Sequence, residues 1–566
     1  MSRSAGDEAR SGADGSEDGS EVHGLGRSAA LAGNRRGLRG RGSRRDRLVG
    51  GVAIAVTVVV VGLVLLVAVR PDGSARRSPA RASGLANSGS GAGGIRQAEV
   101  SINRSVALIS VPRSFLGLST EYWTLPIWER RIPLLARVLA LIHVPGDGPL
   151  AVRIGGDSAD HTYWETSKTE APEWAFELTP AWVGQATTFV RRADVHLLLD
   201  LNLVTATPAI AVQWAQAAQA RLPRGSVVGF EIGNEPDIYS KADWLKLLAG
   251  IGSAAKLLPS TISATSYAEA FGDYALALSQ IRPRLPLLAP ALANPSANLN
   301  WISALLATRP AGLSAITAHR YPYSACAQRG SGYFATIARV LSENATAGMA
   351  KTLRGALGLA RRAGLPLKLT ELNSVTCGGR PGVSNTFATA LWAPDALFEL
   401  LRAGVNAASI HVREYAINSA FVFNKNGLTA NPLFYGMIAF SKMLGRDAKL
   451  VALGLHANSS LHLKAWAVSL RRNLLHVLVI DKGAHPAKLF LHLPGQGAAT
   501  VQRLQAPSVR SHSGVTLGGQ RLNTNGGWSG TATIESLSPS AQGYQLTIAR
   551  QSAAVITVHL RPGAPL

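Results

Sequence analysis

Two glutamates each follow a short apolar run, in the segments FEIGNEPDIY (230–239) and LKLTELNS (367–374). Hydrolysis of a glycosidic bond with retention of configuration needs two carboxyl groups ~5 to 5.5 Å apart, one protonated and one ionised. The carboxyl ends of opposite strands in an eight-stranded barrel can provide that separation. We therefore interpret Glu235 as a general acid/base and Glu371 as a nucleophile.

The residues around this pair suit those two roles. Asn234, directly before the acid, can hydrogen-bond a sugar 2-hydroxyl, a contact that strengthens in an oxocarbenium-like transition state. The two carboxyl groups must titrate at different pH, so the nucleophile needs a cation or a donor beside it. Arg153 in VRIGGDS is the expected cation, and Tyr321 in HRYP is the expected hydroxyl donor.

Three more side chains are candidates for contact with substrate. Asp157 follows Gly155 and Gly156, where the backbone can approach a ligand closely. His319 is either a sugar ligand or a packed, hydrogen-bonded barrel residue. Trp164 can stack on a sugar face, although a buried Trp is ordinarily part of the core.

The region 115–445 alternates short apolar runs with longer segments of helical period, a pattern typical of repeated βα units. The eight runs are FLGLSTE from 115, LAVRIGG from 150, VHLLLDLN from 195, VVGFEIGN from 227, LPLLAPALAN from 285, LSAITAHRY from 313, LPLKLTELN from 365 and AASIHVR from 407. Eight such units predict an α/β fold, a (β/α)8 TIM barrel. A doubly wound open sheet is disfavoured because no Gly-rich dinucleotide turn follows the first run.

The region 446–566 has a different sequence pattern, with short β-prone runs separated by Gly, Pro and Ser clusters. This pattern predicts a C-terminal β-sandwich domain. The segment 98–114 has the same character, so we expect an N-terminal strand that joins the C-terminal sheet.

The N-terminal region predicts a membrane anchor. Residues 49–69 carry no charge and are long enough to cross a bilayer, whereas the apolar part of a cleaved signal peptide, the alternative, is usually shorter. Arginines cluster at 35–47, which places the N-terminus in the cytoplasm and the catalytic domain outside the cell. We predict a disordered basic tail at 1–48, a single-pass transmembrane helix in the cell membrane at 49–69 and a flexible linker at 70–97.

Charge and cysteine content narrow the possible partners. The 566-residue chain has a formal net charge of +23, but apart from the arginines before the span its basic residues are dispersed, so we predict no nucleic-acid partner. Its two cysteines, Cys326 and Cys377, each follow a run that ends at the same barrel mouth, which favours a disulfide in an oxidising compartment. Two cysteines without a nearby His cluster do not make a structural zinc site.

Taken together, the motifs resemble clan A glycoside hydrolases, and within that clan glycoside hydrolase family 79, the β-glucuronidase and heparanase-like family. The segments that carry the resemblance are FLGLSTEYW, VRIGGDSADHTYW, FEIGNEPDIY, ITAHRYP, LTELNS, and HVREY with NPLFYG, in the family's order. The resemblance implies a barrel with a C-terminal β-domain, acid/base Glu235 and nucleophile Glu371. It also implies that Glu121, Asn234 and Tyr321 line the first sugar subsite.

The chain departs from the family pattern after the eighth run. Family members that bind a glucuronate carboxylate use a Gly-rich turn and a Tyr there, whereas this chain reads HVREYAINSA at 411–420. Arg413 and Tyr415 can bind a carboxylate by charge and hydroxyl instead.

We predict an O-glycosyl hydrolase that cleaves β-linked glycosides, preferably β-glucuronides, through a covalent glycosyl-enzyme intermediate, with no cofactor and no metal. The expected partners are an oligosaccharide, polysaccharide or small glycoside and, through one N-terminal helix, the membrane. Two alternatives remain open. One is a non-catalytic, membrane-anchored carbohydrate-binding protein, and the other is a transglycosylase that uses the same two glutamates.

Overall fold

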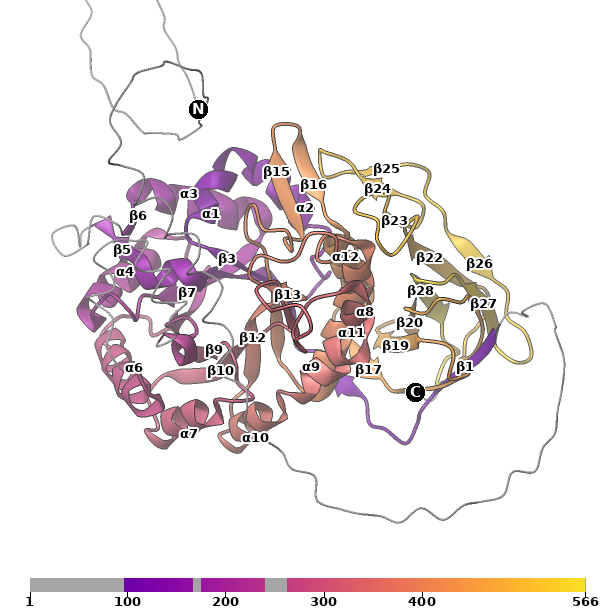
Figure 1. Ribbon diagram of the computed structural model, residues 1–566, viewed down its shortest axis with the longest axis horizontal. Coiled ribbons are helices and arrows are strands. Elements are labelled where there is room, and N and C mark those ends of the chain that lie inside the picture. Colours follow the sequence, from indigo (N-terminus) through magenta and orange to yellow (C-terminus); the bar gives the residue numbers. More distant parts are fainter. Residues whose placement is uncertain (1–95, 166–174, 240–261, 565) are drawn as a thin grey trace, which may run out of the picture. The chain divides into compact units, whose positions relative to one another are not determined.

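A computed structural model describes residues 96–165, 175–239, 262–564 and 566 (Figure 1). The tail predicted at 1–48, the transmembrane helix predicted at 49–69 and the linker up to residue 95 lie outside the described residues. Within the described part, no helix combines the length and the apolar character that a bilayer span requires.

The predicted barrel is confirmed, and each of the eight apolar runs forms one of its strands (Figure 1). The barrel closes in the order β10-β12-β14-β3-β4-β7-β8-β9. Its strands are β3 (Leu116–Glu121), β4 (Leu150–Gly155), β7 (Val195–Leu201), β8 (Val227–Ile232), β9 (Leu287–Leu292), β10 (Leu313–Arg320), β12 (Leu367–Leu372) and β14 (Ala407–His411). All neighbouring pairs are parallel, so the carboxyl ends of the strands meet at one mouth.

Helices that connect the strands surround the barrel. They include α2 (Ile132–Leu139), α3 (Pro180–Ala193), α4 (Pro208–Arg221), α6 (Ala264–Leu278), α7 (Leu299–Ala307), α10 (Arg354–Arg362), α11 (Phe387–Ala403) and α12 (Pro432–Lys442). Two of them, α3 and α4, begin at the same local signal: the side chain of Thr179 or Thr207 accepts a hydrogen bond from a first-turn backbone N–H, and proline follows. Threonine caps and first-position prolines are stable there because the first N–H groups of a helix have no partner within it.

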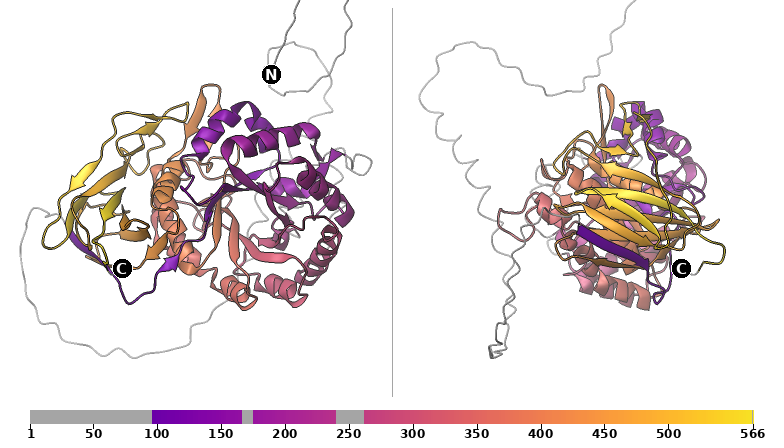
Figure 2. Two further views of the ribbon diagram at one scale, coloured as in Figure 1. Left: turned by 180° about the vertical axis from the view of Figure 1, so that it is seen from behind. Right: turned by 90° about the vertical axis from the view of Figure 1, so that its right-hand side faces the viewer.

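The C-terminal region forms two β-sheets with a shared apolar core. One sheet has the order β18-β1-β21-β27 and the other β2-β17-β19-β20-β28-β22-β23. Their strands are β1 (Arg96–Ile102), β2 (Ile109–Ser110), β17 (Lys449–Val451), β18 (Leu453–Ala457), β19 (Leu463–Leu470), β20 (Leu474–Asp481), β21 (Ala487–His492), β22 (Ala499–Gln505), β23 (Thr516–Leu517), β27 (Tyr544–Ile548) and β28 (Ser552–His559). The right-hand view of Figure 2 shows β1, in indigo, among the later strands.

A buried ion pair joins the barrel to this domain. Asp395 of α11 accepts hydrogen bonds from Lys482 Nζ at 2.5 Å and from Trp466 Nε1 at 2.9 Å. The side chains of Asp395 and Lys482 are both 0% exposed, so neither charge is solvated and each depends on the other. This contact fixes α11, the helix between β12 and β14, against the C-terminal domain.

Candidate active site

The two glutamates lie at the mouth of the barrel, at the carboxyl ends of β8 and β12, which β9 and β10 separate in the strand order, so the two strands are not directly opposite. Glu371 is on β12, whereas Glu235 stands three residues beyond the end of β8 with a left-handed backbone at φ 53°. Its backbone N–H donates to Ala291 O at 3.1 Å, and Pro236 begins the next 3-10 helix. A non-glycine residue in this conformation is unfavourable by itself, and here the neighbouring strand β9 holds it.

The carboxyl groups are close enough for a retaining reaction. One oxygen of Glu235, one oxygen of Glu371 and one ring nitrogen of His319 all lie within 4.8 Å of one another. Retaining glycosidases hold their two carboxyl groups ~5 to 5.5 Å apart, whereas inverting enzymes leave ~6.5 to 9.5 Å for a water. The nearest oxygens of Glu235 and Glu371 are thus closer than the separation that inverting enzymes leave.

Glu371 is surrounded by donors and cations. Tyr321 donates its hydroxyl to Glu371 Oε1 at 2.6 Å, and Arg153 Nη1 donates to Oε2 at 3.1 Å. His411 Nδ1 lies 3.1 Å from Oε1. Burial opposes ionisation of this group, but His411, His319 and Arg153 together hold the pKa of Glu371 well below its usual value.

Glu235 has the opposite environment. Burial and the negative charge of Glu371 raise its pKa, while a hydrogen bond between His319 Nδ1 and Glu235 Oε1 at 2.9 Å opposes that shift. The two carboxyl groups thus have pKa values pushed in opposite directions. A protonated acid beside an ionised nucleophile is the arrangement that double displacement requires.

Arg153 connects Glu371 to a network of buried side chains that no sequence motif indicated. Its guanidinium is 1% exposed and donates to Glu231 at 2.7 Å, to Asp200 at 2.8 Å and to Asn234 Oδ1 at 3.0 Å, besides Glu371. Since the amide oxygen of Asn234 is occupied by Arg153, its NH₂ group remains as the donor for a sugar hydroxyl. The network fixes the orientation of the Arg153 and Asn234 side chains.

His411 is the principal site residue that the sequence analysis missed. It ends β14, its Nδ1 lies 2.9 Å from the Tyr321 hydroxyl, and its Nε2 lies 3.6 Å from Glu121 Oε1. Burial opposes its charge, but Glu371 and Glu121 raise the pKa of His411 to about 10. Its position within the eighth run, two residues before Arg413 at the end of that run, was the available signal, because catalytic groups of barrels lie at the strand ends.

Glu121 lies at the end of β3 and is 1% exposed. A Cβ on Gly156 would lie 2.6 Å from Glu121 Oε1, and a Cβ on Gly155 would lie 2.3 Å from Asp200 Cβ. The two glycines of VRIGGDS therefore make room for buried carboxylates of the protein. Contact of Asp157 with substrate stays a prediction.

Asp157 and Arg413 lie together at the rim of the mouth. Arg413 Nη1 is 3.6 Å from Asp157 Oδ2, both side chains are 42% exposed, and the guanidinium lies 5.6 Å from the ring centroid of Trp123. The enclosed surroundings and the carboxylates of Glu121 and Glu235 raise the pKa of Asp157 to about 7. Tyr415 is 76% exposed, further out on the same loop as Arg413.

Two aromatic candidates have roles other than sugar contact. Trp164 is 3% exposed and stacks on Trp214 with ring centroids 5.5 Å apart. It belongs to a short strand, β5 (Thr162–Trp164), that contacts helix α4, so the expected sugar contact is wrong and the ring is core. His319 is 0% exposed and contacts Glu235, which makes it a packed barrel residue, the second of the two interpretations.

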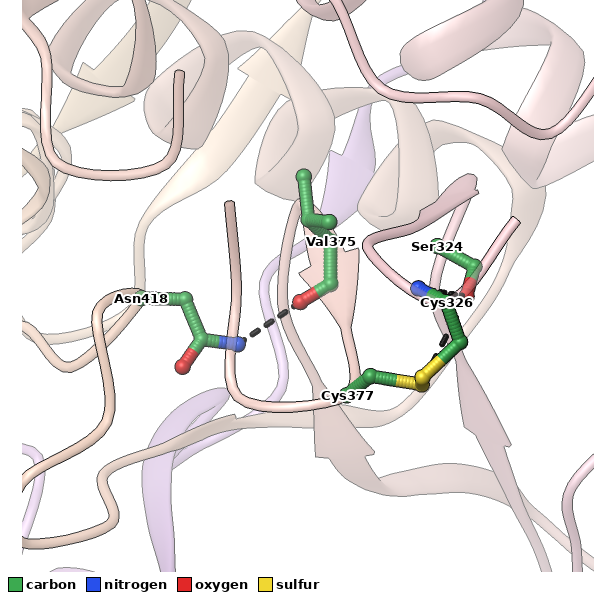
Figure 3. The surroundings of a disulfide bond; sticks show 5 residues. All are labelled: Ser324, Cys326, Val375, Cys377 and Asn418. Atoms are coloured by element: carbon green, nitrogen blue, oxygen red, sulfur yellow. Dashed lines mark hydrogen bonds between the residues drawn. A yellow bond between two sulfur atoms is a disulfide. The ribbon is translucent and has the colours of Figure 1, made fainter. Parts of the chain in front are cut away.

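Cys326 and Cys377 form a disulfide, with Cα atoms 6.0 Å apart (Figure 3). It joins the segments that follow β10 and β12, where the short strands β11 (Tyr323–Ser324) and β13 (Val375–Thr376) also pair. The bond therefore lies at the mouth, on the loops that follow Tyr321 and Glu371.

Glu235, His319 and Glu371 also offer three atoms that a divalent ion could use. The charges around these three residues disfavour a bound divalent ion. Arg153 and His411 already contact the Glu371 carboxylate as cations, so an additional positive ion at this position would be repelled.

Residues 467–562 match the sequence model of the glycosyl hydrolase family 79 C-terminal beta domain. A β-glucuronidase of Aspergillus niger is 28% identical over 188 residues, which are 28% of this chain and 34% of that protein. The resemblance to glycoside hydrolase family 79 is confirmed. A β-glucuronidase of Neurospora crassa is 31% identical over 131 residues, 20% of this chain and 23% of that protein. The matched part thus spans about a third or less of the length of these two β-glucuronidases.

Solved structures agree on the fold. A 4-O-α-L-rhamnosyl-β-D-glucuronidase from Fusarium oxysporum 12S, in complex with Rha-GlcA, superposes with a TM-score of 0.65 at 17% identity. The superposition covers 81% of this chain and 100% of that one. A family 51 arabinofuranosidase from Xanthomonas axonopodis pv. citri has a TM-score of 0.60 at 13% identity, covering 82% of this chain and 100% of that chain. At these identities the similarity shows a shared architecture, a barrel with an additional β-domain.

Proposed function

We propose that the chain is a retaining glycoside hydrolase that cleaves β-linked glycosides by double displacement. The observation that carries this proposal is the pair Glu235 and Glu371, within 4.8 Å of each other and with pKa values shifted in opposite directions. A carbohydrate-binding protein has no need for such a pair, because binding a neutral sugar hydroxyl does not require one protonated and one ionised carboxyl group.

The reaction proceeds in two steps at one anomeric carbon. Glu371 attacks that carbon while Glu235 protonates the departing oxygen, which leaves a glycosyl ester on Glu371. Glu235, now ionised, then takes a proton from water, and the resulting attack cleaves the ester and restores both groups. Asn234, oriented by Arg153, donates to the sugar 2-hydroxyl, and Tyr321 holds Glu371 Oε1 through its hydroxyl.

A β-glucuronide is the proposed substrate. The relatives named above are β-glucuronidases, and Arg413 brings a guanidinium to the rim of the mouth. Its distance of 3.6 Å from Asp157 and the half-exposed position of both groups make that pair weak, so a substrate carboxylate can take the place of Asp157. Arginine and carboxylate form two parallel hydrogen bonds, which gives selectivity over a neutral sugar.

The disulfide supports an oxidising compartment for the catalytic domain. An exported domain agrees with the anchor predicted at 49–69, so we place the proposed activity outside the cell, at the membrane.

The test is turnover of p-nitrophenyl glycosides by the full chain. We expect release of p-nitrophenol from the β-glucuronide, with the β-anomer as the first product seen by proton NMR. Arg413→Ala should raise KM for the β-glucuronide and leave KM for the β-glucoside unchanged. Failure to release p-nitrophenol from any β-glycoside, or an α-anomer as first product, would contradict the proposal.

A further inference from the structure

The disulfide lies at the outer end of a series of contacts between two loops. Tyr321 is five residues before Cys326, and Glu371 is six residues before Cys377. Between those ends, β11 and β13 pair through Tyr323 with Val375 and Ser324 with Thr376. The hydrogen bond from Tyr321 to Glu371, the β11–β13 pair and the disulfide therefore join the same two chain segments in succession.

The loop after β14 is attached to the same segments through two asparagines. Asn418 Nδ2 donates to Val375 O at 2.7 Å, as Figure 3 shows beside the disulfide. Asn373 Nδ2 donates to Asn418 O at 2.9 Å and to His411 O at 3.1 Å. The loop that carries Arg413 is thus held by the segment that Cys377 terminates.

The bond is open to solvent and is chemically unique in the chain. Cys326 and Cys377 are both exposed, and the sequence has two cysteines in total. Any response of the protein to a thiol reductant through cysteine is therefore assigned to this bond. A strand pair of two residues on each side offers few hydrogen bonds to keep the loops together once the bond is cut.

We propose that the Cys326–Cys377 disulfide is a positioning bond for the active site, and that its reduction lowers turnover by separating β11 from β13 and releasing Tyr321 from Glu371. The inference rests on the proposed function. In the reduction, a dithiol reductant supplies two electrons and two protons; the S–S bond breaks, two cysteine thiols form, and the reductant becomes a cyclic disulfide.

Loosening these loops changes both geometry and electrostatics. A displacement of about 1 Å in a catalytic group can reduce the rate by about 100-fold, so we expect kcat to fall about tenfold or more. Loss of the Tyr321 hydroxyl from Glu371 also raises the pKa of Glu371, because a donor to the charged form stabilises it. The acid limb of the kcat/KM profile should therefore move to higher pH.

The experiment compares the full chain, oxidised and reduced by dithiothreitol, with the variant Cys326→Ser/Cys377→Ser. Thiol titration confirms two free thiols in the reduced protein, and circular dichroism confirms that every sample is folded at the assay temperature. Reduced protein and variant should both show the lower kcat and the shifted acid limb. The variant should not respond to dithiothreitol, which controls for effects of the reductant elsewhere.

Two results would overturn the inference. One is an unchanged kcat and pH profile in fully reduced protein. The other is a kcat that falls by the same factor at every pH, which indicates a general structural effect. If the oxidised protein cleaves no glycoside, the proposed function fails, not the positioning role of the disulfide. Hydrogen exchange then tests that positioning role without an activity assay. Loss of amide protection at 321–326 and 371–377 on reduction, with β20 unchanged as a control, supports the positioning role, and unchanged protection at those segments refutes it.

Discussion

Replacing His411 with glutamine removes a positive charge beside Glu371, the proposed nucleophile, and keeps a polar side chain of similar length. His411 Nδ1 lies 3.1 Å from Glu371 Oε1, and the two side chains are 12% and 10% exposed. Unit charges at that distance attract by about 5 kcal/mol at an effective dielectric constant of about 20, equivalent to about four pKa units. This value is an upper bound, because Arg153 remains in contact with Glu371 and water can enter the space left.

We therefore expect the pKa of Glu371 in His411→Gln to rise by about one to two units. The pKa of Glu371 is depressed in the intact protein, and the reaction needs its ionised form. Raising that pKa moves the acid limb of kcat/KM to higher pH. Above the pKa of Glu371 in both proteins, kcat/KM of the variant should be nearly that of the unsubstituted protein. Below the pKa of Glu371 in the variant, its kcat/KM should fall about tenfold per pH unit.

The assay is kcat/KM for p-nitrophenyl β-glucuronide from pH 3 to 8 in buffers of constant ionic strength, with His456→Gln as the control. His456 is an exposed histidine on β18, in the C-terminal domain, so its replacement should leave the profile unchanged. A His411→Gln profile that falls by one factor at every pH, with its acid limb unmoved, would show that His411 acts through shape and not charge.

Three further substitutions test the other assignments. Glu371→Gln should lower kcat by on the order of 10⁴-fold or more on every substrate, and appreciable residual turnover would exclude Glu371 as nucleophile. Glu235→Ala should lower turnover of alkyl glycosides by about 10²- to 10⁴-fold but spare aryl glycosides with good leaving groups, so equal losses on both would refute its role as acid. Lys482→Met should lower the free energy of unfolding by about 3 to 5 kcal/mol, because it leaves the Asp395 carboxylate buried and without its cation. Urea denaturation measures that change against the control Lys488→Met, and equal stabilities of the two variants would contradict it.

The barrel was predictable because its strands are buried on both sides. A strand with the core on one side and helices on the other reads as a continuous apolar run, and β3 and β9 are buried at every residue. The end of such a run marks the mouth, which is how Glu235, Glu371 and Tyr321 could be found without coordinates. The same rule also indicates His411, the last residue of β14.

The carboxylates that hold Arg153 could not be found in this way. Asp200 and Glu231 lie inside strands. Side chains alternate between the two faces of a strand, but the sequence shows which of them meet inside the barrel only if neighbouring strands keep a regular register. The register of β7 against β8 shifts between Leu197 and Leu198, before it brings Asp200 opposite Glu231. A similar shift separates Ala318 from His319 in β10. Counting residues along the sequence does not reveal such shifts, so the network becomes visible only in three dimensions.

The charges of the site explain why Glu371 is held by several partners. Glu121, Asp200, Glu231 and Glu371 are all buried, and four carboxylates enclosed together repel one another unless cations lie between them. Arg153 contacts Asp200, Glu231 and Glu371, while His411 lies between Glu371 and Glu121. Arg153 and His411 thus each contact part of this group of carboxylates, and both contact Glu371. Glu235 is outside both contacts, so burial raises the pKa of Glu235, while the neighbouring cations hold the pKa of Glu371 below its usual value.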